Sequence, residues 1–168
     1  MALDAKIALK VVAALTGSLD LGGVRAPLEV SQVIDLDDGT SSGQADKIWS
    51  DRRTISASSS ENIDLAGALT DALGAALTFA RVKALIIKAS SANVNNVVVG
   101  GHGSAAWATW VSDATDKVVV RPGGFLAFAA PDGTAYAVTA TTADMLTVAN
   151  SSSGSSVTYD IVIIGASA

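Results

Sequence analysis

The chain has 168 residues, of which 49% are hydrophobic and 16% are charged, and its formal net charge is −5. Soluble domains average roughly 25% charged residues, and disorder needs low hydrophobicity with high charge, so we expect one folded chain with apolar surface left for contacts with other copies. The acidic balance argues against a nucleic-acid binder that relies on a basic surface.

The composition also lacks the parts of most catalytic and metal sites. The sequence has no cysteine and one histidine, His102. Disulfides, thiol nucleophiles and cysteine-ligated metals are thereby excluded, and most schemes with a histidine base or ligand lack residues. No apolar run reaches the ~18–20 residues that span a bilayer, and the N-terminus has no secretory-signal pattern. We expect a non-enzymatic protein without cofactor, metal or membrane contact.

The N-terminal part has its own pattern. Residues 6–15 (KIALKVVAAL) are apolar and alanine-rich, and their periodicity does not separate a short helix from a strand. After glycines at 17, 22 and 23, residues 28–36 are predicted to be extended. The small, polar run at 37–43 (DDGTSSG) is typical of a flexible linker.

Beyond this run, short apolar segments recur between turn residues. Twelve candidate strands at 8–12-residue spacing predict a sandwich or barrel. We expect them near residues 47–49, 53–57, 62–65, 77–79, 82–88, 96–99, 106–110, 117–120, 124–129, 135–139, 145–148 and 157–164. Residues 69–76 are the one helical candidate, expected as a short helical turn or a loop. The last strand is apolar on both faces in its second half, which favours a central position or cover by another subunit.

Two polar motifs have a functional and an ordinary interpretation. His102 lies in a Gly-Gly-His-Gly loop without the frame of a nucleophile motif, and we expect an ordinary connecting loop. Asp35, Asp37 and Asp38 resemble a calcium loop, but Gly39 stands where the third ligand belongs, so a solvated turn is the default.

Tryptophans and arginines supply the candidate interface residues. Trp107 and Trp110 are three apart, so on a strand they would face opposite sides, one toward the core and one toward an interface. A sugar-stacking platform that also uses Trp49 is the less favoured alternative. Arg52 and Arg53 are interpreted as salt-bridge partners or as docking points on an acidic neighbour.

Several segments resemble one known family. They are residues 45–54 (ADKIWSDRRT), 62–71 (NIDLAGALTD), 79–85 (FARVKAL), 93–101 (NVNNVVVGG), 120–124 (VRPGG) and 157–165 (VTYDIVIIG). Together they are similar to small virion structural proteins of tailed bacteriophages, over most of the chain from about residue 15 onward. The shared motifs are compositional and turn-based and not catalytic.

The resemblance implies a non-enzymatic capsid decoration (cement) protein on the virion exterior. It implies a mainly β fold, an antiparallel jelly-roll-like sandwich over 45–168 with an extended N-terminal arm over 1–44 that contacts subunits. Its partners would be further copies in a homotrimer and the major capsid protein, with no nucleic acid or membrane. A head-fibre, neck, adaptor or tail protein and a carbohydrate-binding adhesion module are the alternatives.

Overall fold

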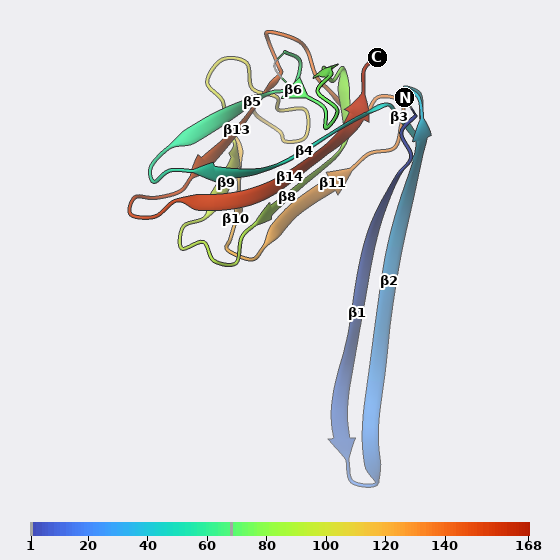
Figure 1. Ribbon diagram of the computed structural model, residues 1–168. Coiled ribbons are helices and arrows are strands. Elements are labelled where there is room, and N and C mark those ends of the chain that lie inside the picture. The colour runs from blue at the N-terminus through green and yellow to red at the C-terminus, as the bar shows by residue number, and fades with distance from the viewer. Residues whose placement is uncertain (1, 68) are drawn as a thin grey trace.

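The computed structural model describes residues 2–67 and 69–168, and this part of the chain forms strands and turns without any helix. Figure 1 shows two parts, a compact two-layer body and a long hairpin that projects from one end of it. The expectation of a mainly β sandwich with an extended N-terminal arm is confirmed.

The hairpin, here called the arm, consists of β1 (Ala5–Leu19) and β2 (Gly22–Asp38). The two strands are antiparallel and pair continuously from Ala5 opposite Leu36 to Leu19 opposite Gly22. Residues 6–15 are therefore a strand. Lys6 and Lys10 would share one side of a helix or of a strand alike, so only the pairing with β2 could decide between the two.

The body is a sandwich of two antiparallel sheets with four main strands each, and the first sheet has a short fifth strand besides. The first sheet contains, in spatial order, β4 (Lys47–Ile55), β14 (Val157–Ala166), β8 (Arg81–Ala89) and β11 (Phe125–Ala129). The second contains β5 (Ser60–Asp64), β13 (Met145–Asn150), β9 (Val97–Gly100) and β10 (Lys117–Val120). Numbered by chain position, the eight strands run 1-8-3-6 and 2-7-4-5. This order is that of a jelly roll, which agrees with the expected jelly-roll-like sandwich, although the strand order itself was not predicted.

Short elements complete the body and correct some expected elements. β3 (Gln44–Ala45) pairs with the end of β2, and β12 (Tyr136–Ala137) pairs with β8. β6 (Leu69–Thr70) and β7 (Ala76–Leu77) form a small hairpin where a helical turn or loop was expected. The candidate strands at 47–49 and 53–57 are one strand, β4. Residues 106–110 are turns with a single bridge at Ala106, and the strand expected there is wrong.

The main core lies between the two sheets. On β14, Val157, Tyr159, Ile161 and Ile163 alternate into it, and all four are buried. Ile164, on the opposite side of β14, is also buried because the base of the arm packs over it. The central position of β14 between β4 and β8 and this second cover explain why its second half is apolar on both faces.

Candidate interaction surface

The arm is an amphipathic ribbon. Directly paired residues of an antiparallel ladder lie on the same side, and successive residues alternate between sides. One side, here called the apolar face, carries no ionisable side chain among its described residues. It consists of Ile7, Leu9, Val11, Ala13, Leu15 and Leu19 on β1 and of Val24, Ala26, Leu28, Val30, Gln32 and Ile34 on β2.

The other side, here called the polar face, carries the charged groups of the arm. Lys6 Nζ lies 3.1 Å from Asp35 Oδ1, and Lys10 Nζ lies 2.8 Å from Glu29 Oε1. All four side chains are well exposed, and such surface pairs contribute only about 0–1 kcal/mol each. The polar face also exposes Val12 and Val33, so the two faces of the arm differ in that only the polar face carries charged groups.

Most of the apolar face is open to solvent. Leu15 is 78% exposed, Leu28 is 55% exposed and Val30 is 53% exposed. Monomeric soluble proteins rarely expose a contiguous apolar patch beyond a few hundred Å², and larger patches mark interaction sites. The arm thus carries a surface that is suited to contact with another protein.

At the base of the arm, the same face is already covered by the body. Ala5 and Leu36 are buried in a cluster with Ala84 of β8 and Ile164 of β14, which lie on the outer side of the first sheet. Ile7 and Ile34 pack at the margin of this cluster. The interface within the chain therefore continues outward as the exposed apolar face.

A buried lysine holds the base of the arm to the body. The pairing of β8 with β14 passes from Ala84 to Val82, so Lys83 is the extra residue of a β-bulge. Lys83 is fully buried, and its Nζ donates hydrogen bonds to the carbonyl oxygens of Ser41 (3.3 Å) and Asp132. Burial, together with the nearby charge of Arg81, lowers the pKa of Lys83.

The predicted flexible linker is therefore a fixed loop. Besides the bond from Lys83 to Ser41, Gly43 N donates to Pro131 O at 2.7 Å and Asp37 N donates to Gly43 O at 3.0 Å. Gly39 and Gly43 have positive φ values of 136° and 72°, which glycine adopts with the least strain. The small residues of this segment thus serve a tight turn and not a free tether.

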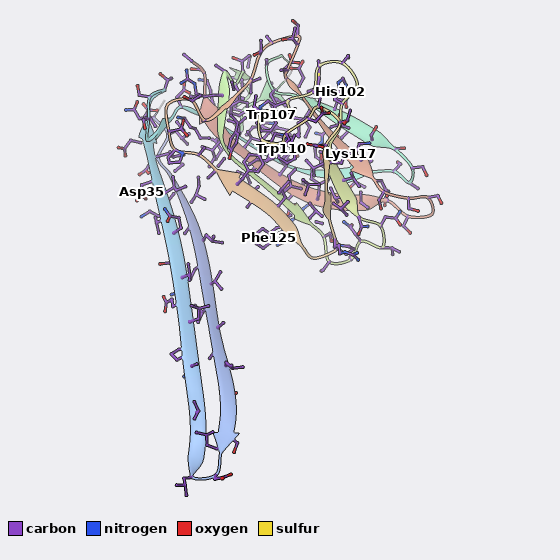
Figure 2. All side chains as sticks on the ribbon, turned by 180° about the vertical axis from the view of Figure 1, so that it is seen from behind. Asp35, His102, Trp107, Trp110, Lys117 and Phe125 are labelled. Atoms are coloured by element: carbon purple, nitrogen blue, oxygen red, sulfur yellow. The ribbon has the colours of Figure 1, made fainter. Side chains whose placement is uncertain are left out.

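An apolar groove lies in the angle between arm and body, here called the root groove. It has a volume of about 240 Å³ and is lined on the arm by Ile7, Leu9 and Ile34 and on the body by Phe125 and Ala127, among others. Phe125 is 68% exposed. Figure 2 shows its side chain projecting from β11 on the side of the body that faces the arm. The groove joins the apolar face to the sheet surface.

The three tryptophans lie differently from the sequence-based expectation. Trp49 and Trp107 are buried in the main core, at 8% and 2% exposure, and have little surface to offer to a partner. Trp110 is half-buried and does not face away from Trp107. The two ring centroids are 6.1 Å apart, and Trp110 stacks on Phe128 at 5.2 Å. No exposed indole is available here for a sugar-stacking platform.

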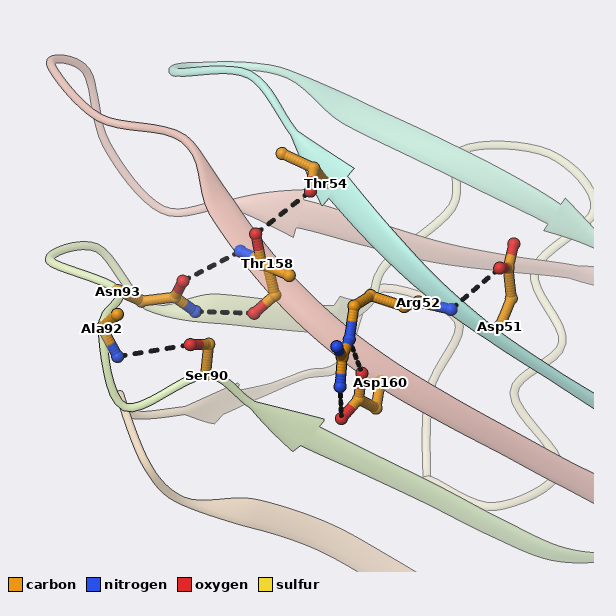
Figure 3. Close-up of polar contacts among 8 residues, drawn as sticks. All are labelled: Asp51, Arg52, Thr54, Ser90, Ala92, Asn93, Thr158 and Asp160. Atoms are coloured by element: carbon orange, nitrogen blue, oxygen red, sulfur yellow. Dashed lines mark hydrogen bonds and ion pairs between the residues drawn. The ribbon is translucent and has the colours of Figure 1, made fainter.

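The two arginines have carboxylate partners within the chain. Arg52 forms a bidentate pair with Asp160, with Nε–Oδ1 at 2.6 Å and Nη2–Oδ2 at 3.1 Å (Figure 3). This pair holds the pKa of Asp160 below its usual range. Arg53 Nη2 lies 2.5 Å from Glu61 Oε2, which connects the edge strands β4 and β5. The salt-bridge interpretation is confirmed, and contact of the exposed Arg52 with a partner stays a prediction.

Tyr159 belongs to the network of Arg53. Its hydroxyl donates to Glu61 Oε1 at 3.0 Å while Glu61 Oε2 accepts from Arg53. Burial, and then the negative charge of Glu61, raises the pKa of Tyr159 above its usual range. The network closes the edge of the sandwich between the two sheets.

The remaining polar candidates have structural roles. His102 Nδ1 accepts hydrogen bonds from the backbone N–H groups of Ser104 (3.3 Å) and Ala105 (3.2 Å), which shapes its loop. Asp35 pairs with Lys6, and Asp38 accepts from Leu3 N at 3.0 Å. Among the described residues, no three acidic, histidine or cysteine side chains are placed to share a metal ion.

The apolar face was not predicted from the sequence. Its signal was present as alternation, with Ile7, Leu9 and Val11 out of phase with Lys6 and Lys10. The matching alternation on β2 becomes informative only when the two strands are paired in register.

No family model, no curated protein and no solved structure matches this chain. Within the described residues, no helix has the length and apolarity needed to cross a membrane.

Proposed function

We propose that this chain is a non-enzymatic structural protein of a tailed-bacteriophage virion, a capsid decoration protein that bridges and stabilises major capsid subunits from the outside. The observation that carries the proposal is the arm, a long hairpin with one apolar face that is anchored firmly to a jelly-roll body. Jelly rolls recur in viral capsid proteins and in lectins, so the fold alone does not select the function. The resemblance of several sequence segments to small virion proteins supports the capsid proposal over the lectin alternative.

The proposed mechanism is bridging. The body contacts the shell and the arm joins neighbouring copies of the chain, so that once one contact has formed the others become effectively intramolecular. The fixed base of the arm reduces the conformational entropy lost on binding, because the direction of the arm is already set. A protein that binds the assembled shell and not free capsid subunits stabilises the shell by mass action.

The test is binding to purified expanded shells of the virus that encodes the chain. We expect saturable binding at hundreds of copies per particle and a raised melting temperature of the shell. Absence of binding would contradict the proposal. A copy number of tens at one vertex would instead identify a neck, tail or head-fibre component. Imaging of the decorated particle would give the position and the symmetry of the bound oligomer, which we propose to be a trimer.

A further inference from the structure

We infer that the apolar face of the arm is covered by the arm of a second copy of this chain. This arm-to-arm contact rests on the proposed function, in which copies of the chain form an oligomer on a shell. Its test uses the isolated chain without a shell, so the contact and the decoration function can fail separately.

The exposed area matches what a stable contact between copies buries. Seven side chains of the apolar face are 45–78% exposed: Leu9, Val11, Leu15, Leu19, Val24, Leu28 and Val30. Together they present on the order of 700 Å², close to the roughly 800 Å² per partner of a standard-size interface. The apolar face of one arm therefore offers enough surface for a stable contact with the arm of a neighbouring copy.

The charge distribution favours a second copy at this place. Each chain carries a net charge of −5, so two copies repel each other through most of their surface. The described residues of the apolar face include no ionisable side chain, while the ion pairs Lys6–Asp35 and Lys10–Glu29 and the side chain of Arg25 lie on the polar face. Two copies can thus meet face to face without burying a charge and without needing a partner of opposite charge.

The root groove indicates the shape of the occupant. It lies in an angle between Ile7 and Leu9 of the arm and Phe125 of the body, as Figures 1 and 2 show for the two parts. A broad, flat partner reaches only one wall of such an angle. A two-stranded hairpin, whose strands are about 4.8 Å apart, is narrow enough to lie on the apolar face and reach Phe125 as well.

The arm offers a matched pair of variants as a test. Val11 and Val30 face each other across the ladder on the apolar face, whereas Val12 and Val33 lie on the polar face of the same two strands. All four are exposed, at 45%, 53%, 66% and 49%. V11N/V30N therefore places two amides in the proposed interface, and V12N/V33N makes the same chemical change outside it.

Self-association is measured by sedimentation of the full chain between about 1 and 100 µM. We expect the wild type and V12N/V33N to associate with similar affinity, and V11N/V30N to dissociate at least tenfold more readily, with unchanged circular dichroism. A monomeric wild type, an unaffected V11N/V30N or equal loss in both variants would each overturn the inference.

Shell binding separates this inference from the proposed function. A wild type that remains monomeric in solution but decorates shells overturns the arm-to-arm contact and leaves the decoration function standing. A wild type that associates through the apolar face but does not bind shells supports the inference and removes the decoration function. Hydrogen exchange of the two double variants then locates the protected strands, and protection confined to the body would also count against an arm-to-arm contact.

Discussion

At the scale of single residues, Lys83 connects the two parts of the molecule. Its ammonium group is buried and bonded to backbone carbonyls of Ser41, just beyond the arm, and of Asp132, in a loop of the body. A buried charge is retained only where hydrogen bonds offset its desolvation. The β-bulge places Lys83 at this position, since a regular ladder would have paired it with β14.

We predict that Lys83→Met destabilises the protein by about 1–3 kcal/mol, because the hydrogen bonds from the buried ammonium group to Ser41 and Asp132 are lost. Urea denaturation measures the loss, and limited proteolysis should show faster cleavage in residues 39–43. Lys88→Met is the control, as Lys88 is an exposed residue on the same strand and should change stability by less than about 0.5 kcal/mol. Equal effects of the two variants would contradict the proposed anchoring role.

The raised pKa of Tyr159 predicts that the folded protein loses stability at alkaline pH. Its pKa is raised in the folded state, so its contribution is complete below the unfolded pKa of about 10 and is lost as the pH rises above that value. We expect Tyr159→Phe to cost roughly 1 kcal/mol at pH 7, because the bond to Glu61 is lost, and to lose less stability than the wild type on going from pH 9 to pH 11.

Denaturant titrations at the two pH values check this expectation. Tyr136→Phe is the matched control, since Tyr136 packs edge-on against Phe128 and lies outside the network of Glu61. Parallel pH profiles for the wild type and Tyr159→Phe would show that the phenol of Tyr159 does not contribute to the alkaline loss.

At the scale of elements, the arm separates its two chemistries by strand alternation. Ile7, Leu9 and Val11 continue the surface that packs on Ala84 and Ile164, while Lys6 and Lys10 lie on the other side. A slip of one residue in the pairing of β1 with β2 would mix the faces. The ion pairs Lys6–Asp35 and Lys10–Glu29 therefore contribute to register more than to stability.

The absence of native cysteine allows a direct probe of the two faces. We predict that the thiol of Leu15→Cys reacts several-fold more slowly with a maleimide in the assembled protein than the thiol of Thr16→Cys, its neighbour on the polar face. Dilution to the monomer should bring the two rates together, because both positions are then exposed. Equal rates at every concentration would show that the apolar face stays uncovered.

At the scale of the whole molecule, the proposed arm-to-arm contact should form more readily as salt is added, because the chain is acidic and the apolar face carries no charge. Salt screens the repulsion between copies of net charge −5, with a Debye length of about 10 Å at 0.1 M, and does not weaken apolar burial. We expect the dissociation constant to fall or stay constant between about 0.05 and 0.5 M sodium chloride. Dissociation at high salt would indicate an interface held by ion pairs.

The local sequence pattern was sufficient to predict much of the body. The alternation of Val157, Tyr159, Ile161 and Ile163 correctly predicted the inner face of β14, and the strand expected at residues 117–120 has the bounds of β10. The turn after β10 was also predictable, since proline at 122 and glycine at 123 suit a type II turn, and Gly123 has φ of 74°. These features depend on residues that are close together along the chain, so they can be predicted from the sequence.

The aromatic cluster, the buried lysine and the apolar face of the arm were decided by tertiary structure alone. Trp107 and Trp110 point into one aromatic cluster because residues 106–110 form turns in the connection from β9 to β10, and nothing local distinguishes these turns from a strand. The burial of Lys83 depends on a slip in its pairing with a strand about eighty residues away. The apolar face exists only because β1 and β2 pair in one register. Composition determined that this chain would be β-rich with apolar surface to spare, whereas the location of that surface followed from long-range pairing, which no local pattern specifies.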